Sequence, residues 1–522
     1  MLGFKRSMVQ SVILLSWAIQ HCTFGLLTLW YTFALLLLVS VVLAITTYDH
    51  DYWTDRGVFS PPGLPIVGHI ISVVTFKEQG GMCFKRIYDI YKNERFLGTH
   101  QFYQRTLVVR DPELIKRICV NDFQHFVDRG FFFNKDVDPL AGSVLFLRGN
   151  EWKRLRAKIS PIFSPNKLRG MFPLIENTAQ EFVIRIRDLL SKSEDNNKIP
   201  QTEDLFEKHS AVVDSESLVG GYTADAIVPC AFGLKSNVMY DQNDPFAVAL
   251  HAFYEMSIYN IFEKTMRQFW PAFVLFFRMR IIPKKTHDFF YNIVTSVLRA
   301  RERGEQEKRG DFIDMMMALR NDEKNNNVKA ADSEDVEITD MVISANAFII
   351  FLGGFETTSS TLAFLFLELA AHPEVQEKMR QEITDVLGRN DGRITYEVLQ
   401  ELTYMEMVIQ ETLRLYPPFP SIQRMCTKDY IIPGTNISVE KGTIVLFPTL
   451  GIQRDKLVSC KRFAMIQMKC CLVSVLQHVR ISPLVRTKNG GLAKPRTEPF
   501  EADPRSPLTL HPADSLVRLS LL

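Results

Sequence analysis

The stretch that decides the fold is TDMVISANAFIIFLGGFETTSSTLAFLFLELAAHP, which runs from Thr339 to Pro373. It predicts one long helix, with Thr339 as the N-cap and Pro373 as the residue that stops it. At 1.5 Å per residue this helix is roughly 50 Å long, enough to cross a whole domain. Its apolar residues lie on nearly all sides, so we expect it to be buried.

The middle of this helix departs from the pattern of a buried helix. Gly353 and Gly354 each cost about 1 kcal/mol relative to alanine, but they let a bulky group approach the backbone. Glu356 and Thr357 place a carboxylate and a hydroxyl among apolar neighbours, where an unpaired carboxylate is unfavourable. The pattern indicates a working site at a bend of the helix. The alternative is a kinked core helix with a solvated notch.

Composition limits the class of protein. The chain has 522 residues, of which 46% are hydrophobic, so it is long enough for a sizeable core. Its formal net charge of +2 gives no reason to expect a nucleic-acid partner. The eight cysteines are scattered without a CxxC pair, which is typical of a reducing compartment and not of a disulfide framework.

The N-terminal part predicts a membrane anchor over residues 1–47. Residues 23–46 are uncharged and apolar, and as a helix they would be about 36 Å long, which spans a bilayer. A second apolar run, residues 8–19, is either an extension of the anchor or half of a hairpin. Residues 48–69 are rich in proline and glycine and predict a stiff hinge before the globular domain.

A second informative stretch is NEWKRLRAK, which begins at Asn150 and predicts a helix. Trp152 and Arg156 are spaced i, i+4, so they share one face, where an indole N–H and a guanidinium are able to clamp a carboxylate. The alternative is a surface helix with a half-buried tryptophan. The basic side chains that point elsewhere form a patch and are Lys153, Arg154 and Lys158.

Two regions between these stretches are less specific. Residues 240–290 are rich in aromatic side chains, which suits either a lid over an apolar pocket or ordinary helical core. Residues 321–337 are polar and charged and predict a solvated loop.

The part after the central helix predicts an ion pair and a small sheet. Glu411 and Arg414 are spaced i, i+3 on a helix, and their apolar neighbours indicate a partly buried pair. Arg424 follows in a run that turns to strand, and a strand is also expected at residues 106–109.

Four motifs occur in a fixed order: the anchor followed by PPGLP, then WKRLR, GGFETT and ETLR. Together they closely resemble a microsomal cytochrome P-450, a haem-thiolate monooxygenase, and the text around YWTDRG and FVDRGFFF looks most like the insect detoxification group. The resemblance implies a mainly α-helical fold with a small β-sheet region, preceded by an N-terminal transmembrane helix. Residues 70–522 would then form the catalytic domain.

The resemblance also implies roles for individual residues. Gly353 and Gly354 would lie over haem b, and Glu356 and Thr357 would relay protons to iron-bound dioxygen. Trp152, Arg156 and Arg424 would bind the haem propionates, and Glu411 and Arg414 would fix the core near the haem ligand. The aromatic residues expected in the substrate pocket are Phe131, Phe132 and Phe133.

The partners and location follow from the same resemblance. An NADPH-cytochrome reductase would dock on the patch of Lys153, Arg154 and Lys158 and supply electrons, with cytochrome b5 as a further partner. The substrate would be an apolar small molecule. The anchor would hold the chain in the endoplasmic reticulum membrane with the catalytic domain facing the cytosol.

One departure from the family pattern concerns the haem ligand. The family carries a cysteine in a loop of the form FxxGxRxCxG, and this sequence contains no such loop. The segment that would hold it is expected to be missing between Asp455 and Lys456. Cys460 is the candidate substitute ligand, and its alternative is a free thiol, whereas Cys470 and Cys471 are expected in the core.

Three functions therefore stay open. The first is a monooxygenase that hydroxylates apolar compounds with O2 and electrons from NADPH. The second is a catalytically inactive splice form or pseudogene product of that family that lacks the haem-thiolate loop. The third is a membrane-anchored binding module without haem.

Overall fold

The computed structural model describes residues 31–37, 49, 51–102, 104–195, 210–254, 271–307, 309–325, 336–455, 465–486, 492–493, 500–506 and 509–522. The α-helices beyond residue 50 are α2 Ile71–Val74, α3 Gly80–Ile90, α4 Pro112–Lys116, α5 Gly149–Ile159, α6 Pro165–Asp195, α7 Ser215–Phe232, α8 Pro245–Tyr254, α10 Pro271–Phe276, α11 Lys284–Glu302, α12 Phe312–Asn325, α13 Asp340–Ala371, α14 Pro373–Arg389, α15 Tyr396–Glu401, α16 Thr403–Leu415, α17 Thr449–Arg454 and α18 Met465–Leu476.

The strands are short and group into separate small sheets. They are β1 Phe96–Gln101, β2 Gln104–Val109, β3 Ser210–Asp214, β4 Ile422–Met425, β5 Tyr430–Ile431, β6 Ser438–Val439, β7 Ile444–Phe447, β8 Val479–Pro483, β9 Val485–Arg486, β10 Leu492–Ala493 and β11 Leu516–Leu521. The largest sheet has the order β1-β2-β7-β4, and β2 and β7 in it are parallel. The fold is mainly helical with a small sheet region, as predicted.

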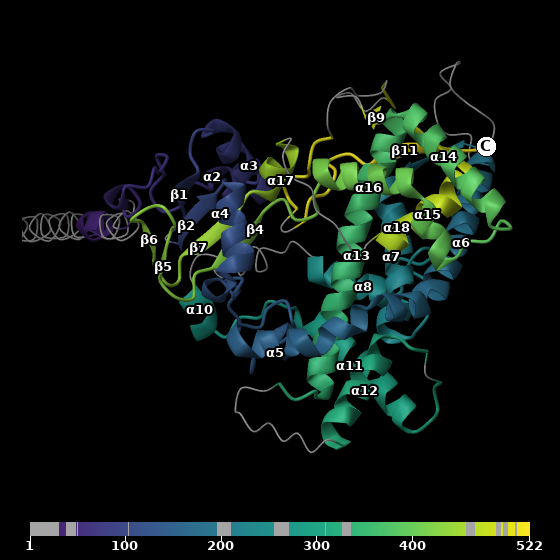
Figure 1. Ribbon diagram of the computed structural model, residues 1–522, viewed down its shortest axis with the longest axis horizontal. Helices are drawn as coiled ribbons and strands as arrows, with labels where there is room; N and C mark the ends of the chain where they lie inside the picture. Colours follow the sequence, from purple (N-terminus) through teal and green to yellow (C-terminus); the bar gives the residue numbers. More distant parts are fainter. Residues whose placement is uncertain are drawn as a thin grey trace, which may run out of the picture.

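The central helix α13 has the predicted bounds. The Thr339 hydroxyl accepts the N–H of Val342 at 3.3 Å and so satisfies one of the free donors of the first turn. Buried residues recur along its whole length, on nearly all sides. Because it packs against α7, α11, α16 and α18, α13 is the element around which the helical part is built, and Figure 1 shows it running through that part.

The molecule has a helical part and a sheet-containing part, which lie side by side in Figure 1. The large apolar core surrounds α13, α7 and α18, whereas a smaller core lies beneath the β1-β2-β7-β4 sheet. The N-terminal connector joins this smaller core. Trp53 is fully buried, and its Nε1 donates to the carbonyl of Thr99 at 3.1 Å. The predicted hinge therefore packs directly on strand β1.

Two expectations about the peripheral segments need comment. The predicted loop at 321–337 is wrong in its first part, because helix α12 continues to Asn325; residues 326–335 lie outside the described part. Of the predicted anchor, only residues 31–37 are described, and they are helical with exposed apolar side chains. Among the described helices only α13 is long and apolar enough to cross a membrane, and most of it is buried in the core.

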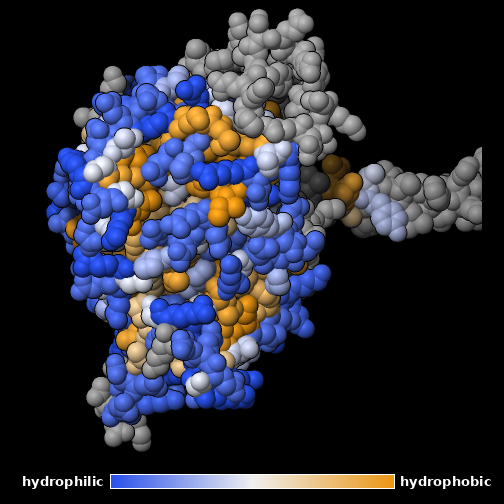
Figure 2. Space-filling view, turned by 90° about the vertical axis from the view of Figure 1, so that its right-hand side faces the viewer, coloured by the Kyte–Doolittle hydropathy of each residue, from blue (hydrophilic) through white to orange (hydrophobic). Residues whose placement is uncertain are grey.

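The surface of the helical part is mixed in character. Figure 2 shows a face that is mainly hydrophilic, with separate hydrophobic areas between the charged side chains. Apolar helices such as α13 and α18 are thus enclosed by amphipathic ones, which is how a soluble helical domain is usually layered.

Candidate functional site

The two glycines of α13 have different surroundings. A Cβ added at Gly354 would lie 2.7 Å from Cδ1 of Ile227, so this glycine allows α13 and α7 to approach closely. A Cβ added at Gly353 would meet nothing within 4 Å, and Gly353 is exposed. The helix therefore has one packed face and one open face at this level, and the open face leaves room for a bulky group beside the backbone.

Glu356 is one turn beyond Leu352 and is 5% exposed. Its carboxylate is fully engaged. Tyr254 of α8 donates to Oε2, Thr509 donates to Oε1, and Nε2 of His511 lies 3.6 Å from Oε1. These partners explain how a carboxylate is tolerated inside the helical core. Sequence reasoning identified Glu356 and did not anticipate any of the three partners.

Thr357 lies next to this acid on the more open side of the helix. It is half-buried, and its hydroxyl donates to the carbonyl of Gly353 at 2.6 Å. Gly353 and Thr357 are spaced i, i+4 and so share the open face of α13. The structure thus brings together an open backbone, a hydroxyl and, one residue away, a buried acid.

A loop before α5 positions the second half of the site. The Asp128 carbonyl accepts the N–H of Met425 at 2.8 Å, and the Asp128 carboxylate accepts the N–H of Gly149 at the start of α5, also at 2.8 Å. Gly130 has a φ of +79°, and a Cβ there would lie 2.7 Å from Cδ1 of Ile444. Asp128 therefore ties strand β4 to helix α5, and the turn at Gly130 needs glycine.

This arrangement gathers cationic and N–H groups from three elements. The guanidinium of Arg129 lies 5.8 Å from the ring of Trp152 on α5, and the guanidinium of Arg424 on β4 lies 6.0 Å from the ring of Phe123. The rings of Phe123 and Trp152 are 5.8 Å apart. Arg156, four residues after Trp152, is close enough for its charge to act on Arg129. Arg129, Trp152 and Arg424 are half-buried, whereas Arg156 is exposed. We call Arg129, Trp152, Arg156 and Arg424 the cationic pocket.

Two polar atoms of the cationic pocket lack described partners, and its other described hydrogen bonds go to backbone carbonyls. Nε1 of Trp152 and Nε of Arg424 are buried without a hydrogen bond within the described part of the chain, and no described carboxylate lies within ion-pair distance of Arg129 or Arg424. Burial and the charges of Arg424 and Arg156 lower the pKa of Arg129 to about 10. Burial likewise lowers the pKa of Arg424. Such a pocket requires an anion from outside the chain.

Arg129 is a site residue that sequence reasoning missed. It stands in a loop, FVDRG, without helical or strand periodicity. The only signal was an arginine between an aspartate and a glycine, the two residues that pin and turn this loop.

The Glu411–Arg414 pair forms as predicted but is not buried. The two side chains are joined by two hydrogen bonds of 2.6 and 2.7 Å, and Arg414 also donates to the carbonyl of Gln453 at 3.2 Å. Their side chains are 56% and 32% exposed. The expectation of a partly buried pair is therefore wrong for Glu411, since the apolar residues beside it point to other faces of α16.

The other predicted side chains are only partly brought together. Lys158 forms an ion pair with Glu323 at 2.8 Å and so faces α12, whereas Lys153 is exposed. Phe131 and Phe133 both contact Phe146, at ring distances of 5.3 and 6.3 Å. The basic patch is consequently smaller than predicted, and the phenylalanine cluster is half-buried beside the cationic pocket's loop.

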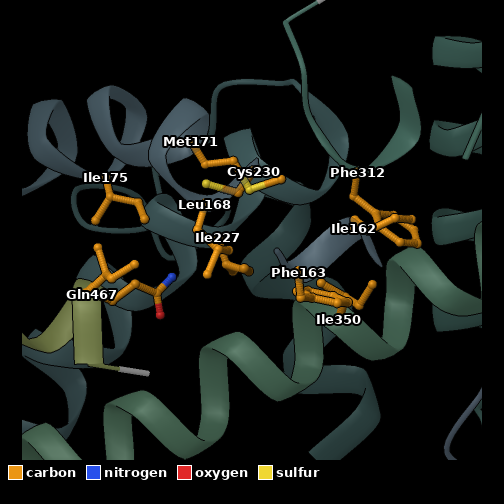
Figure 3. A pocket seen from close by; sticks show the side chains of 11 residues that line it. Ile162, Phe163, Leu168, Met171, Ile175, Ile227, Cys230, Phe312, Ile350 and Gln467 are labelled. Atoms are coloured by element: carbon orange, nitrogen blue, oxygen red, sulfur yellow. The ribbon is translucent and has the colours of Figure 1, made fainter. Parts of the chain in front are cut away.

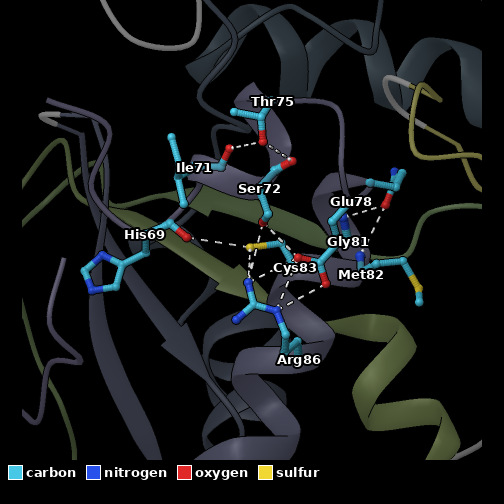
Figure 4. Close-up of polar contacts among 10 residues, drawn as sticks. His69, Ile71, Ser72, Thr75, Glu78, Gly81, Met82, Cys83 and Arg86 are labelled. Carbon is cyan, nitrogen blue, oxygen red and sulfur yellow. Dashed lines mark hydrogen bonds and ion pairs between the residues drawn. The ribbon is translucent and has the colours of Figure 1, made fainter. Parts of the chain in front are cut away.

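Burial raises the pKa of each of the six described cysteine thiols. Burial raises the pKa of Cys470 and Cys471, which lie in the core as predicted. Burial also raises the pKa of Cys83, whose sulfur contacts the carbonyl of His69 and the guanidinium of Arg86 (Figure 4). Cys119 is half-buried near Arg424, and burial raises its pKa too. Cys460 lies outside the described residues.

One enclosed cavity lies on the packed side of α13. It has a volume of about 30 Å³ and is lined by apolar side chains that include Ile227, Cys230 and Ile350, with Gln467 of α18 at one end (Figure 3). The cavity lies between α7, α13 and α18 and is separate from the open face of α13 at Gly353.

The cationic pocket fits the end of haem that carries the two carboxylates. Haem is flat and carries two carboxylates, and the cationic pocket supplies unpartnered N–H donors and positive charge for carboxylates. Gly353 supplies an open helix face for a flat ring. Together with the mainly helical fold, these features fit a haem-binding protein.

The comparisons with known proteins agree. Residues 59–458 match the family described as Cytochrome P450. The chain is 32% identical over 429 residues to cytochrome P450 6B1 of Papilio polyxenes, covering 81% of each chain. It is 32% identical to cytochrome P450 6k1 of Blattella germanica over 81% of this chain and 79% of that protein, and 33% identical to probable cytochrome P450 6a23 of Drosophila melanogaster over 80% and 79%. The chain belongs to the cytochrome P450 family, whose members are haem b monooxygenases.

Proposed function

We propose that this chain hydroxylates apolar small molecules with O2, using electrons that an NADPH-dependent reductase delivers. The observation that carries the proposal is the cationic pocket, which has no described carboxylate partner. Its buried Trp152 Nε1 and Arg424 Nε lack hydrogen bonds, and a ligand that brings carboxylates would satisfy them. Membership of the cytochrome P450 family supports haem as that ligand.

The chain's own residues would divide the work as follows. Arg129, Trp152, Arg156 and Arg424 would hold the two propionates and so fix the plane of the ring. Gly353 keeps the face of α13 open above that plane. When bound, haem supplies the activation of oxygen.

Glu356 and Thr357 would provide protons beside the ring. Glu356 is buried and hydrogen-bonded on both carboxylate oxygens, so it is held in one position. Thr357 presents a hydroxyl on the open face, one residue away. A fixed acid next to a hydroxyl is suited to hand a proton to a bound reactant.

The proposed partners and location have weaker support. Exposed Lys153 and the basic groups near it are compatible with an acidic reductase, or with cytochrome b5, on the side of α5. The exposed apolar side chains of residues 31–37 suit a helix in the endoplasmic reticulum membrane, with the catalytic domain on the cytosolic side.

A second candidate function is a catalytically inactive form of the same family. It is favoured by one observation: the sequence lacks the FxxGxRxCxG loop, and the family match ends at residue 458, before Cys460. A chain without a working thiolate ligand would keep the cationic pocket and the open helix face but would not activate oxygen.

The absorption spectrum of the reduced, CO-bound full-length protein distinguishes the two functions. A red-shifted Soret band of thiolate-ligated haem supports the monooxygenase, and its loss in Cys460→Ala would identify that ligand. The matched control is Cys119→Ala, a half-buried thiol near Arg424, which should keep the band. The absence of the red-shifted band after incubation with haem and removal of unbound haem supports the inactive form.

A further inference from the structure

A line of polar side chains leads from the surface of α7 to the buried acid of α13. Nδ1 of His511 lies 2.6 Å from Oε1 of Glu216, and Nε2 of His511 lies 2.8 Å from the hydroxyl of Thr509. The Thr509 hydroxyl in turn donates to Oε1 of Glu356. The side chains become less exposed along the line, from 37% for Glu216 to 18% for His511 and 7% for Glu356.

When His511 carries a proton on both nitrogens, its hydrogen bonds run in two directions: outward to Glu216, and inward through Thr509 to Glu356. Nδ1–H then donates to Glu216, Nε2–H donates to the Thr509 oxygen, and the Thr509 hydroxyl donates to Glu356. Burial alone lowers the pKa of His511, but its bonds to Glu216 and its attraction to Glu356 outweigh burial and raise that pKa to about 9. His511 is therefore charged at neutral pH.

Other charged or titratable groups near the line do not interrupt it. Asp503, on the same C-terminal segment, is close enough to feel the charge of His511, and its own partner is Arg505. Tyr254 of α8 occupies the second oxygen of Glu356. This leaves Oε1 of Glu356 to face Thr509 and His511 only.

We propose that Glu216, His511 and Thr509 form the route by which protons from water reach Glu356. The proposal rests on the proposed function only for the use of the proton, since the route itself is built from this chain's residues. His511 is a positioning and relay residue here, because it reaches the reacting region through Thr509 and Glu356.

The proton balance of one delivery closes without any oxidant or reductant. The Thr509 hydroxyl gives its proton to Oε1 of Glu356 while it takes the Nε2 proton of His511. Neutral His511 keeps the Nδ1 proton that faces Glu216. Its bare Nε2 takes a proton from a hydronium ion when the imidazole turns toward water, and the side chain then returns to Thr509. One proton has then moved from the hydronium ion to Glu356, and Thr509 and His511 have regained their starting protonation.

The test measures how fast Glu356 gains a proton after a rapid drop in pH. The full-length protein is followed by time-resolved infrared absorption of the protonated carboxyl group, and the band of Glu356 is assigned by its loss in Glu356→Gln. We expect Glu216→Gln, His511→Gln and Thr509→Val to slow the signal by about tenfold or more. Thr509→Ser keeps the hydroxyl and should keep the rate.

His372 provides a matched control. It also lies between two glutamates, 3.6 Å from Glu368 and 3.2 Å from Glu374, but at the exposed C-terminal end of α13. His372→Gln should therefore leave the rate unchanged. Rates for Glu216→Gln and Thr509→Val equal to that of the unchanged protein would overturn the route, and Glu216→Gln alters a partly exposed side chain that is not needed for the core.

The readout requires no haem, so it separates this proposal from the proposed function. Slower protonation of Glu356 in the variants, together with no red-shifted Soret band in the unchanged protein, would support the route and reject the monooxygenase. A red-shifted Soret band together with unchanged protonation rates in the variants would support the monooxygenase and reject the route.

Discussion

Two sets of arginines in this molecule, one buried and one half-buried, differ in their partners. Arg301 of α11 has no exposed side-chain area and binds the carboxylates of Asp311 and Asp314 at 2.6 and 2.8 Å. Arg129 and Arg424, by contrast, reach only backbone carbonyls within the described residues. The Arg301 guanidinium is therefore paired with carboxylates, whereas the guanidinium groups of Arg129 and Arg424 have no described carboxylate partner.

The pKa values of these arginines shift in opposite directions because their partners differ. Burial would lower the pKa of Arg301, but its bonds to Asp311 and Asp314 raise it overall. At Arg129 and Arg424 nothing opposes burial effectively, and both pKa values are lowered. Removing a paired buried arginine therefore leaves its carboxylates uncompensated, while an arginine without a carboxylate partner is a candidate site for an anionic ligand.

The largest effect is expected from breaking the paired set. Arg301→Met leaves Asp311, which is completely buried, without its cation, and this should lower the free energy of unfolding by about 3–5 kcal/mol. Chemical denaturation of the full chain measures it. The matched control is Arg303→Met, two residues on, whose side chain is 67% exposed and should change stability by less than about 0.5 kcal/mol.

The opposite sign is expected in the cationic pocket. Arg129→Met removes a half-buried charge that has no described carboxylate partner, so the haem-free chain should keep its free energy of unfolding or gain about 1 kcal/mol. Haem binding should weaken by about 2 kcal/mol, or about 30-fold, because a charged hydrogen bond to a propionate is lost. A loss of stability in the haem-free Arg129→Met chain, like that of Arg301→Met, would break the comparison.

The same contrast exists between two tryptophans. Nε1 of Trp152 is buried without a described partner, whereas Nε1 of Trp53 donates to the Thr99 carbonyl at 3.1 Å. Trp152→Phe should weaken haem binding by about 1 kcal/mol and leave unfolding unchanged. Trp53→Phe should lower the free energy of unfolding by about 1 kcal/mol and leave haem binding unchanged. Haem titration and denaturation of both variants check this pair, and equal effects on stability would contradict it.

The parts of this site that depend on local sequence pattern were predictable from the sequence. The helix from Thr339 was predicted because its cap, its apolar residues and its terminal proline are adjacent in the chain. The i, i+4 spacing placed Trp152 and Arg156 on one face for the same reason. Arg424 was predicted from the family resemblance.

The remaining site residues depend on long-range contacts that local pattern does not encode. Arg129 reaches the cationic pocket only because Asp128 pairs with Met425 on a strand far along the chain. Thr509 and His511 reach Glu356 only because the C-terminal segment returns to α13, where Ser360 donates to the carbonyl of Leu510. No spacing within either segment indicates its distant partner.

The smallest effect is expected where an arginine is paired but exposed. Arg414→Met breaks two hydrogen bonds to Glu411, yet solvent screens a pair whose side chains are 32% and 56% exposed, so stability should fall by less than about 1 kcal/mol. The bond to Arg414 lowers the pKa of Glu411, partly offset by burial. A lowered carboxyl pKa contributes stability above the unfolded value of about 4.3, and that stability is lost as pH falls through the folded value.

Denaturation of the unchanged chain and of Arg414→Met at several pH values tests this last arginine. The two curves should differ by the full small amount at neutral pH and converge as Glu411 is protonated on acidification. Glu411→Gln should remove the same pH dependence and serves as the control. A difference as large as that of Arg301→Met, or one that persists after Glu411 is protonated, would mean that pairing alone sets the effect. The burial of the pair, which separates Arg301 from Arg414, would then be irrelevant.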